Sequence, residues 1–296
     1  MKISIFERCN PFSHKPGTRC LIPGTREVVS AFPAKINDEF LDVEGPVKEW
    51  TVFQDLERAR IQIRGRAKNG MFTREIPGIS LPKKAKLSFG AHKAQVMEKV
   101  IERCDPAEFL PLWHALAQYY PAEPSKDLGD CLLGDIQHAD RLDLFQVWKN
   151  LFHAGFSEWM IPRALDEGYH GFAKAPINGN DPFVLFTMGI TLIQEMIVRW
   201  DGAALYILPR IPPELHCGRL VDVHIPGLGM LSVEWSKKEI KKMIVTPEIT
   251  AEISIVHPKR IQGYRVKSGN SCSRQTIDKP LQIEKDVVLF FDQFQH

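Results

Sequence analysis

The stretch that most constrains the fold is Asp181–Trp200, DPFVLFTMGITLIQEMIVRW, which is long and apolar enough to form a buried helix. Asp181 is suited to cap the first turn, and Pro182 fits the first helical position. Gly202 can adopt the left-handed conformation that ends a helix. From Ala203 onwards the chain looks extended and then alternates with period two, as strands do. The sequence therefore predicts a long helix that leads directly into a β-sheet.

Helical periodicity extends back from this stretch to about residue 90. Asp105-Pro106-Ala107-Glu108 provides a cap, a proline at the first helical position and an acid at the third, which is typical of a helix start. Another helix is expected to open at Asp140, with an apolar inner face. That face consists of Leu144, Trp148, Leu151 and Phe152.

The first 89 residues have the pattern of strands. In Glu57–Ala67, small and aliphatic residues alternate with arginines. Lys68-Asn69-Gly70 is a hairpin signal, so the following MFTREI is expected to be the partner strand. The basic stripe would suit phosphates or polyanions, although such stripes are more often solvated faces paired with acidic neighbours. It consists of Arg58, Arg60, Arg64 and Arg66.

Residues 202–296 predict a sandwich of short antiparallel strands. Two sets of alternating apolar residues face the same way on neighbouring strands, with Pro226–Gly229 as the turn between them. The sets are Val221, Val223 and Ile225, and Leu231, Val233 and Trp235. DVVLFF near the end is expected to form the last strand. The whole pattern predicts an α+β protein: an N-terminal antiparallel β-domain (1–89), a short helical module (90–201) and a C-terminal β-sandwich (202–296).

Composition narrows the classes of partner. A net charge of +2 gives no electrostatic reason to expect nucleic acid or an acidic membrane surface as a partner. The six cysteines contain no CxxC pair, which is more typical of reduced, cytoplasmic thiols than of a disulfide framework. The longest apolar run, Phe183–Val198, is broken by Gln194-Glu195 and is too short to span a membrane. We therefore expect a cytoplasmic protein.

The segment from residue 177 to about 245 resembles the closing section of (α/α)6-barrel glycoside hydrolases of the 1,2-α-L-fucosidase kind. In that family an Ile-Asp-Gly-Asn turn precedes a helix that ends in Glu-Met, and Leu-Pro, Gly-Leu and Trp-containing strands follow. The corresponding segments here are Ile177–Asn180, Glu195-Met196, Leu208-Pro209, Gly218–Val223 and Ser232–Trp235. The resemblance implies glycoside-hydrolase ancestry, with a C-terminal β-domain after a helical barrel.

Two departures from that family bear on activity. Asn178 stands where the family has an aspartate that helps water attack, and an amide orients water but accepts no proton at neutral pH. A barrel of twelve helices, at about 11 residues each with loops of about 2–8, needs on the order of 160–220 residues. The interval 90–201 is shorter than this, so we expect a truncated barrel.

Inverting glycoside cleavage needs two carboxyl groups about 6.5–9.5 Å apart. The candidate catalytic residues are Asp135, Glu158, Asp166 and Asn178, the last as the group that orients water. The candidate substrate-binding residues are Trp113, His138, Trp159 and Tyr169. The competing interpretation is that the acids are surface residues and the tryptophans belong to the core. A metal shared by Asp135, His138 and Asp140 is less favoured, and we expect no metal and no cofactor.

No self-sufficient catalytic motif is present, so two functions are carried forward. The first is a carbohydrate-active protein that hydrolyses or binds an oligosaccharide or other glycan. The alternative is a non-catalytic glycan-binding or scaffold protein descended from such an enzyme. Whether two carboxylates of the helical module share one cleft discriminates between them.

Overall fold

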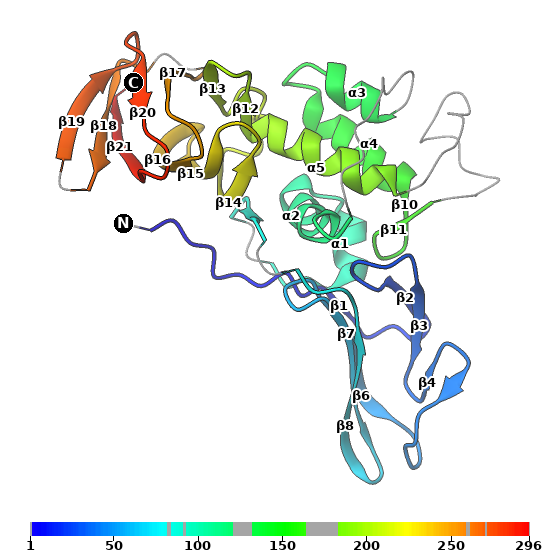
Figure 1. Cartoon of the computed structure of the whole chain (residues 1–296). Coiled ribbons are helices and arrows are strands. Elements are labelled where there is room, and N and C mark those ends of the chain that lie inside the picture. Colours follow the sequence, from blue (N-terminus) through cyan, green and yellow to red (C-terminus); the bar gives the residue numbers. More distant parts are fainter. Residues whose placement is uncertain are drawn as a thin grey trace.

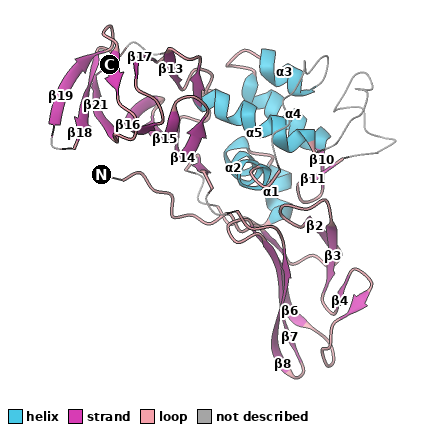
Figure 2. Cartoon of the chain, viewed as in Figure 1, coloured by secondary structure: helices cyan, strands magenta, loops and turns pink. Residues whose placement is uncertain are grey.

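The computed structural model of the chain describes residues 2–81, 84–90, 93–120, 132–163, 183–258, 261–269 and 271–295 (Figure 1). Helices gather between an elongated β-arm from the N-terminal strands and the sheets of the C-terminal half (Figure 2). The predicted α+β class is confirmed, because helices and mainly antiparallel sheets occupy separate regions. None of the helices in the described part of the chain has the length and apolar character needed to cross a membrane.

The N-terminal strands form two antiparallel sheets. The first has the order β1 (Phe12–Ser13), β6 (Lys48–Asp55), β7 (Arg60–Ala67) and β8 (Gly70–Pro77). The second consists of β2 (Thr18–Leu21), β3 (Val28–Phe32), β4 (Lys35–Ile36) and β5 (Glu39–Phe40). Strand β7 pairs with β8 from Arg60 opposite Pro77 to Ala67 opposite Gly70, so the predicted hairpin is confirmed.

Three arginines of the basic stripe, Arg60, Arg64 and Arg66, lie on β7 and have acidic or aromatic neighbours. Arg60 lies 2.7 Å from Glu75 and 3.6 Å from Asp55. Arg66 lies 3.3 Å from Glu49, and the guanidinium of Arg64 lies 5.2 Å from the ring centroid of Phe53. On the opposite face Ala59, Ile61 and Ile63 are buried. The stripe is thus a solvated face with acidic and aromatic neighbours, as the less specific interpretation expected.

The described helices are α1 (Met97–Arg103), α2 (Pro106–Ala117), α3 (Leu132–His138), α4 (Leu144–Gly155) and α5 (Val184–Ile197). The helix start predicted at Asp105 is confirmed, because its carboxylate accepts the backbone N–H of Ala107 at 3.0 Å. Helix α2 packs on α5 through Trp113, whose indole nitrogen donates to the carbonyl of Leu185 at 3.2 Å. A Cβ on Gly189 would lie 2.6 Å from the Trp113 ring, so only glycine permits this approach.

The long helix ends earlier than predicted. Helix α5 stops at Ile197, and Val198–Trp200 forms strand β12 in a hairpin with β13 (Ala204–Ile207). The Asp201 carboxylate accepts the N–H groups of Ala203 and Ala204 at 3.0 and 2.7 Å. Gly202 has a φ of +99°, so it serves the hairpin turn rather than a helix end. The expected caps Asp181 and Pro182 lie outside the described residues.

One further boundary differs from prediction. The candidate residues Asp135 and His138 lie in helix α3, which ends at His138. Asp140 does not open the next helix directly, because its carbonyl accepts the N–H groups of Asp143 and Leu144 in a turn before α4. Short-range spacing does not separate such a turn from a first helical turn.

The C-terminal half contains a seven-stranded sheet, and one of its strands comes from the N-terminal part of the chain. Its order is β19 (Ser271–Thr276), β18 (Gly263–Ser268), β21 (Leu289–Gln295), β16 (Glu239–Pro247), β15 (Gly229–Ser236), β14 (Cys217–Ile225) and β9 (Lys86–Ser88). The last strand lies inside this sheet, as predicted. The predicted domain boundary after residue 89 stays a prediction. Strand β9 lies before that boundary but pairs with β14 of the C-terminal half.

A smaller sheet has the order β12, β13, β17 (Ala251–Val256) and β20 (Leu281–Ile283). Buried residues of both sheets belong to one apolar cluster, which also includes residues of the helices and the N-terminal strands. The smaller sheet is not wholly antiparallel, since β13 and β17 pair in parallel. The short strands β10 (Phe156–Ser157) and β11 (Ile161–Pro162) form a separate hairpin.

A β-bulge changes which face one predicted core residue occupies. The register of β14 against β15 shifts between Leu220 and Val223, where Asp222 has a φ of +55°. Because side chains alternate with period two, the extra residue turns Val221 to the opposite face. There it packs with Ile3 and Ile5 of the N-terminal segment. The segment Lys2–Phe6 therefore covers one face of this sheet without being one of its strands.

Helix α2 also buries a histidine completely. The side chain of His114 is fully buried, and its Nε2 atom has no hydrogen-bond partner in the described structure. Loss of hydration disfavours the charged imidazolium, so burial lowers the pKa of His114 to about 4. Since an unfolded histidine has a pKa near 6.5, the unfolded state binds a proton first as pH falls, and stability is lost progressively below pH about 6.5.

We predict that His114→Leu removes part of the acid sensitivity of folding. Between pH 7 and pH 5 the wild-type free energy of unfolding should fall by about 2 kcal/mol more than that of the variant. Chemical denaturation at both pH values measures this difference. The exposed His153 on α4 supplies the control, because His153→Leu should keep the wild-type pH dependence. Equal pH dependence in His114→Leu and wild type would contradict the assignment.

Candidate functional site

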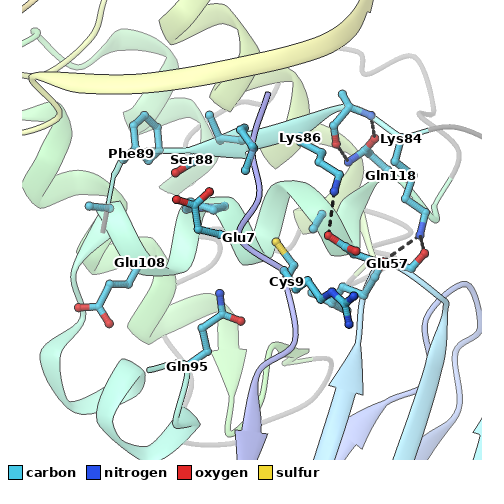
Figure 3. Close-up of a pocket in the computed structure, with 18 of the residues that line it drawn as sticks. Glu7, Cys9, Glu57, Lys84, Lys86, Ser88, Phe89, Gln95, Glu108 and Gln118 are labelled. Atoms are coloured by element: carbon cyan, nitrogen blue, oxygen red, sulfur yellow. Dashed lines mark hydrogen bonds and ion pairs between the residues drawn. The ribbon is translucent and has the colours of Figure 1, made fainter. Parts of the chain in front are cut away.

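A pocket of about 270 Å³ lies where the N-terminal segment, the chain around β9 and helices α1 and α2 meet (Figure 3). Ile5–Cys9 forms one side, residues 84–89 form another, and α2 contributes Glu108, Ala115 and its neighbour Gln118. The pocket thus joins segments that the sequence places in separate parts of the chain. Its walls contain apolar side chains together with amide, carboxylate, ammonium and thiol groups.

One side chain fixes the pocket's second wall to helix α2. The amide of Gln118 donates to the carbonyl of Ala85 at 2.9 Å and accepts the N–H of Ala85 at 2.8 Å. This pair imitates one rung of a β-ladder, so the backbone leading into β9 is satisfied by a side chain instead of a strand. Tyr119 adds a second tie, since its hydroxyl donates to the carbonyl of Leu56 at 2.7 Å.

Two of the carboxylates that line the pocket are engaged in ion pairs. Glu57 lies 2.9 Å from Lys86, and Glu108 lies 2.9 Å from Lys93 and also pairs with Arg103. Burial raises the pKa of Glu108, but hydrogen bonds from Arg103 and Lys93 outweigh that effect and leave the pKa below its usual value. Glu108 is therefore a carboxylate near neutral pH and not a proton donor.

Lys84 has different surroundings from the other pocket cations. Its Nζ atom donates to the carbonyls of Leu56 and Glu57 at 2.8 and 3.3 Å, and also to the hydroxyl of Tyr119. Desolvation lowers the pKa of Lys84 to about 8, although Asp55 and Glu57 act in the opposite direction. A substantial fraction of Lys84 is therefore a neutral amine under mildly alkaline conditions.

Cys9 lies between Glu7 and Glu57 in the close-up (Figure 3). Burial, followed by the nearby charge of Glu57, raises the pKa of the Cys9 thiol to about 12. Since the thiolate is the nucleophile, this thiol is inert at neutral pH despite lining the pocket.

Two of the predicted catalytic residues, Asp135 and Glu158, lie in the described part of the chain. Asp135 lies half-buried on α3. Glu158 lies in the turn between β10 and β11 with a φ of +42°. Neither residue lines the pocket. Asp166 and Asn178 lie outside the described residues.

The three predicted sugar-binding residues that the structure describes, Trp113, His138 and Trp159, do not line this pocket either. Trp113 and Trp159 are buried, with 0% and 2% of their surface exposed. Trp113 packs edge-on against Trp148 and Phe156, so neither of these two predicted residues offers an exposed ring face to a ligand. His138 is exposed at the end of α3, and Tyr169 lies outside the described residues.

The predictions missed the residues that do form the pocket, among them Glu7, Lys84 and Gln118. The only signal near them was the Pro/Lys-rich stretch ISLPKKAKL, which predicts a linker. Contact between the N-terminal segment and α2 spans about a hundred residues of sequence, and local periodicity carries no information on such a contact. Within the described residues no group of three or more metal-ligating side chains is positioned to hold an ion.

No family model and no curated protein matches this chain. Among solved structures, the chain is similar to a GH127 β-L-arabinofuranosidase from Geobacillus stearothermophilus T6, with 10% identity and a TM-score of 0.21. That alignment covers 64% of this chain and 31% of the arabinofuranosidase. The neighbour is a glycoside hydrolase but not of the fucosidase kind, and a likeness this low carries no argument about fold or activity.

The raised pKa of Cys9 leads to a prediction about thiol reactivity. In the native protein at pH 8, iodoacetamide should label the exposed Cys272 on the order of a hundredfold faster than Cys9, because too little Cys9 thiolate is present to react. Peptide-resolved mass spectrometry measures both rates. The guanidine-unfolded chain is the control, in which the two rates should become similar. Comparable rates in the native protein would show that the Cys9 thiol is not suppressed.

Proposed function

We propose that this chain is a carbohydrate-binding protein of glycoside-hydrolase ancestry. It binds an oligosaccharide at the pocket lined by Lys84 and Gln118 and does not hydrolyse it. The ancestry rests on the ordered resemblance of residues 177–245 to the fucosidase kind of hydrolase. The binding role rests on the pocket itself, which is the observation that carries the proposal.

The composition of the pocket suits a sugar. A pyranose has apolar C–H faces and a rim of hydroxyl groups, so its binding site needs an apolar wall beside hydrogen-bonding groups. Leu56, Leu87 and Phe89 supply apolar surface. Ser88 and Gln95 supply groups that donate to or accept from hydroxyls.

Two observations favour binding over hydrolysis at this pocket. A glycosidase needs one protonated and one ionised carboxyl group facing the scissile bond. Of the pocket's carboxyl groups, Glu57 and Glu108 are held in ion pairs with Lys86 and Lys93. Asp135 and Glu158, the described residues predicted for catalysis, do not line it.

Filling the pocket should abolish binding. Ala115 lines the pocket on α2 and is half-buried, so Ala115→Phe places a ring in the space that a ligand would occupy. We expect affinity for a glycan identified by array screening to fall at least about tenfold, which corresponds to 1.4 kcal/mol. Isothermal titration calorimetry measures the loss.

The matched control is Ala154→Phe, since Ala154 is a half-buried alanine on α4 that does not line this pocket. It should leave affinity unchanged while testing whether a phenylalanine on a helix disturbs the fold. Wild-type affinity in a folded Ala115→Phe variant, or no glycan bound by the wild type across the array, would overturn the proposal.

The hydrolytic assignment of Asp135, Glu158, Asp166 and Asn178 remains a separate prediction. If it is correct, Asp135→Asn or Glu158→Gln should reduce turnover of an aryl-glycoside by at least about a hundredfold, since removal of an acid or base costs that much. Release of the aryl group is followed by absorbance, with the pocket variant Ala115→Phe measured alongside. Turnover that is unchanged in both carboxyl variants would remove these two residues from the catalytic assignment.

A further inference from the structure

Lys84 differs from its neighbours in what surrounds its amino group. Among the described residues, the groups that accept hydrogen bonds from Nζ are two backbone carbonyls and the Tyr119 hydroxyl, all of them neutral. Nζ also lies 3.8 Å from the centroid of the Tyr119 ring. The two other lysines that line the pocket have carboxylate partners, because Lys86 pairs with Glu57 and Lys93 pairs with Glu108. Within the described ranges, Lys84 is thus partly buried and has no carboxylate within hydrogen-bonding distance of its amino group.

We propose that Lys84 is a reactive amine that forms a Schiff base with an aldehyde entering this pocket. The site consists of Lys84 as nucleophile, Tyr119 as the hydroxyl beside it, and the apolar wall of Leu56 and Leu81. Nothing in this inference requires the ligand to be a carbohydrate, although the open-chain form of a reducing sugar belongs to the same chemical class.

The electrostatic environment supports this reactivity. An amine attacks a carbonyl only in its neutral form, and desolvation of a lysine in an apolar pocket is one way in which proteins supply that form. The pKa of Lys84 is lowered to about 8, chiefly by burial and slightly by Lys86. Asp55, Glu57 and Cys9 act in the opposite direction.

The reaction balances without a further reagent. The Nζ lone pair forms a bond to the carbonyl carbon, and the carbonyl π electrons move to oxygen, which takes up a proton to give a carbinolamine. Loss of the hydroxyl with one proton as water then leaves a C=N bond between the aldehyde carbon and Nζ. The Tyr119 hydroxyl accepts a hydrogen bond from Nζ and donates its own proton to the carbonyl of Leu56, so it holds the amine in place while water carries the proton from nitrogen to the departing oxygen.

Reductive trapping tests the inference. The folded protein is exposed to glycolaldehyde and sodium cyanoborohydride, which reduces the C=N bond to a stable secondary amine, and adducts are located by peptide-resolved mass spectrometry. At pH 7.5 Lys84 should gain the adduct at least about tenfold faster than the exposed Lys285, because the lowered pKa of Lys84 leaves a larger share of it as the neutral amine than a lysine has in water. The advantage should shrink as pH rises above 8.

Two variants sharpen the experiment. Lys84→Arg should remove the fast-labelling site and leave the rate at Lys285 unchanged. Ala115→Phe, which fills the pocket, should slow labelling at Lys84 but not at Lys285. Labelling of Lys84 no faster than Lys285 in wild type, or a fast site that persists in Lys84→Arg, would overturn the inference.

The result is distinguishable from that of the carbohydrate-binding proposal. A sugar alcohol has no aldehyde, so its binding reports on the pocket as a glycan site alone. Fast trapping at Lys84 without glycan binding would support the amine chemistry and overturn the proposed function, whereas glycan binding without trapping would do the reverse.

Discussion

The close packing of helix α2 on helix α5 is the contact on which the rest of the structure depends. The Trp113 ring occupies the space where any side chain larger than hydrogen at Gly189 would have to lie. Because α2 is held there, the two residues that follow it reach two other segments of the chain. Gln118 forms hydrogen bonds with the backbone of Ala85, and the Tyr119 hydroxyl donates a hydrogen bond to the carbonyl of Leu56. A single helix therefore joins α5, the first sheet and the strand that completes the C-terminal sheet.

The same arrangement creates the pocket. Strand β9 closes against β14 only because Gly218 leaves room for it, since a Cβ there would lie 2.7 Å from the carbonyl of Ser88. The N-terminal segment then covers the sheet through Ile3 and Ile5 and carries Glu7 and Cys9 to the pocket. The resulting site has a neutral environment around one amine and ion pairs around two carboxylates. These properties suit ligand binding and amine chemistry better than acid–base cleavage of a glycosidic bond.

Local signals predicted local structure well. The Asp105 cap, the Lys68–Gly70 hairpin and the turn at Pro226–Gly229 all appear where the sequence places them, because each depends on a few adjacent backbone groups. Predictions failed where strand pairing overrides the local hydrophobic pattern. Val198–Trp200 continues an apolar helical pattern, yet pairing with Leu205–Ile207 draws it into a strand. Val221 departs from the expected alternation because the bulge at Asp222 turns it to the opposite face of the sheet, where Ile3 and Ile5 cover it.

The sequence by itself determined the α+β class, the order of strands, helices and strands, and most turns, since hydrophobic period and capping chemistry are encoded within a few residues. Only the tertiary structure decided which polar side chains share a pocket. Glu7, Lys84 and Gln118 are far apart in the chain, and neither period nor charge relates them. Their environments, and hence the lowered pKa of Lys84 and the inert thiol of Cys9, arise from burial against distant segments.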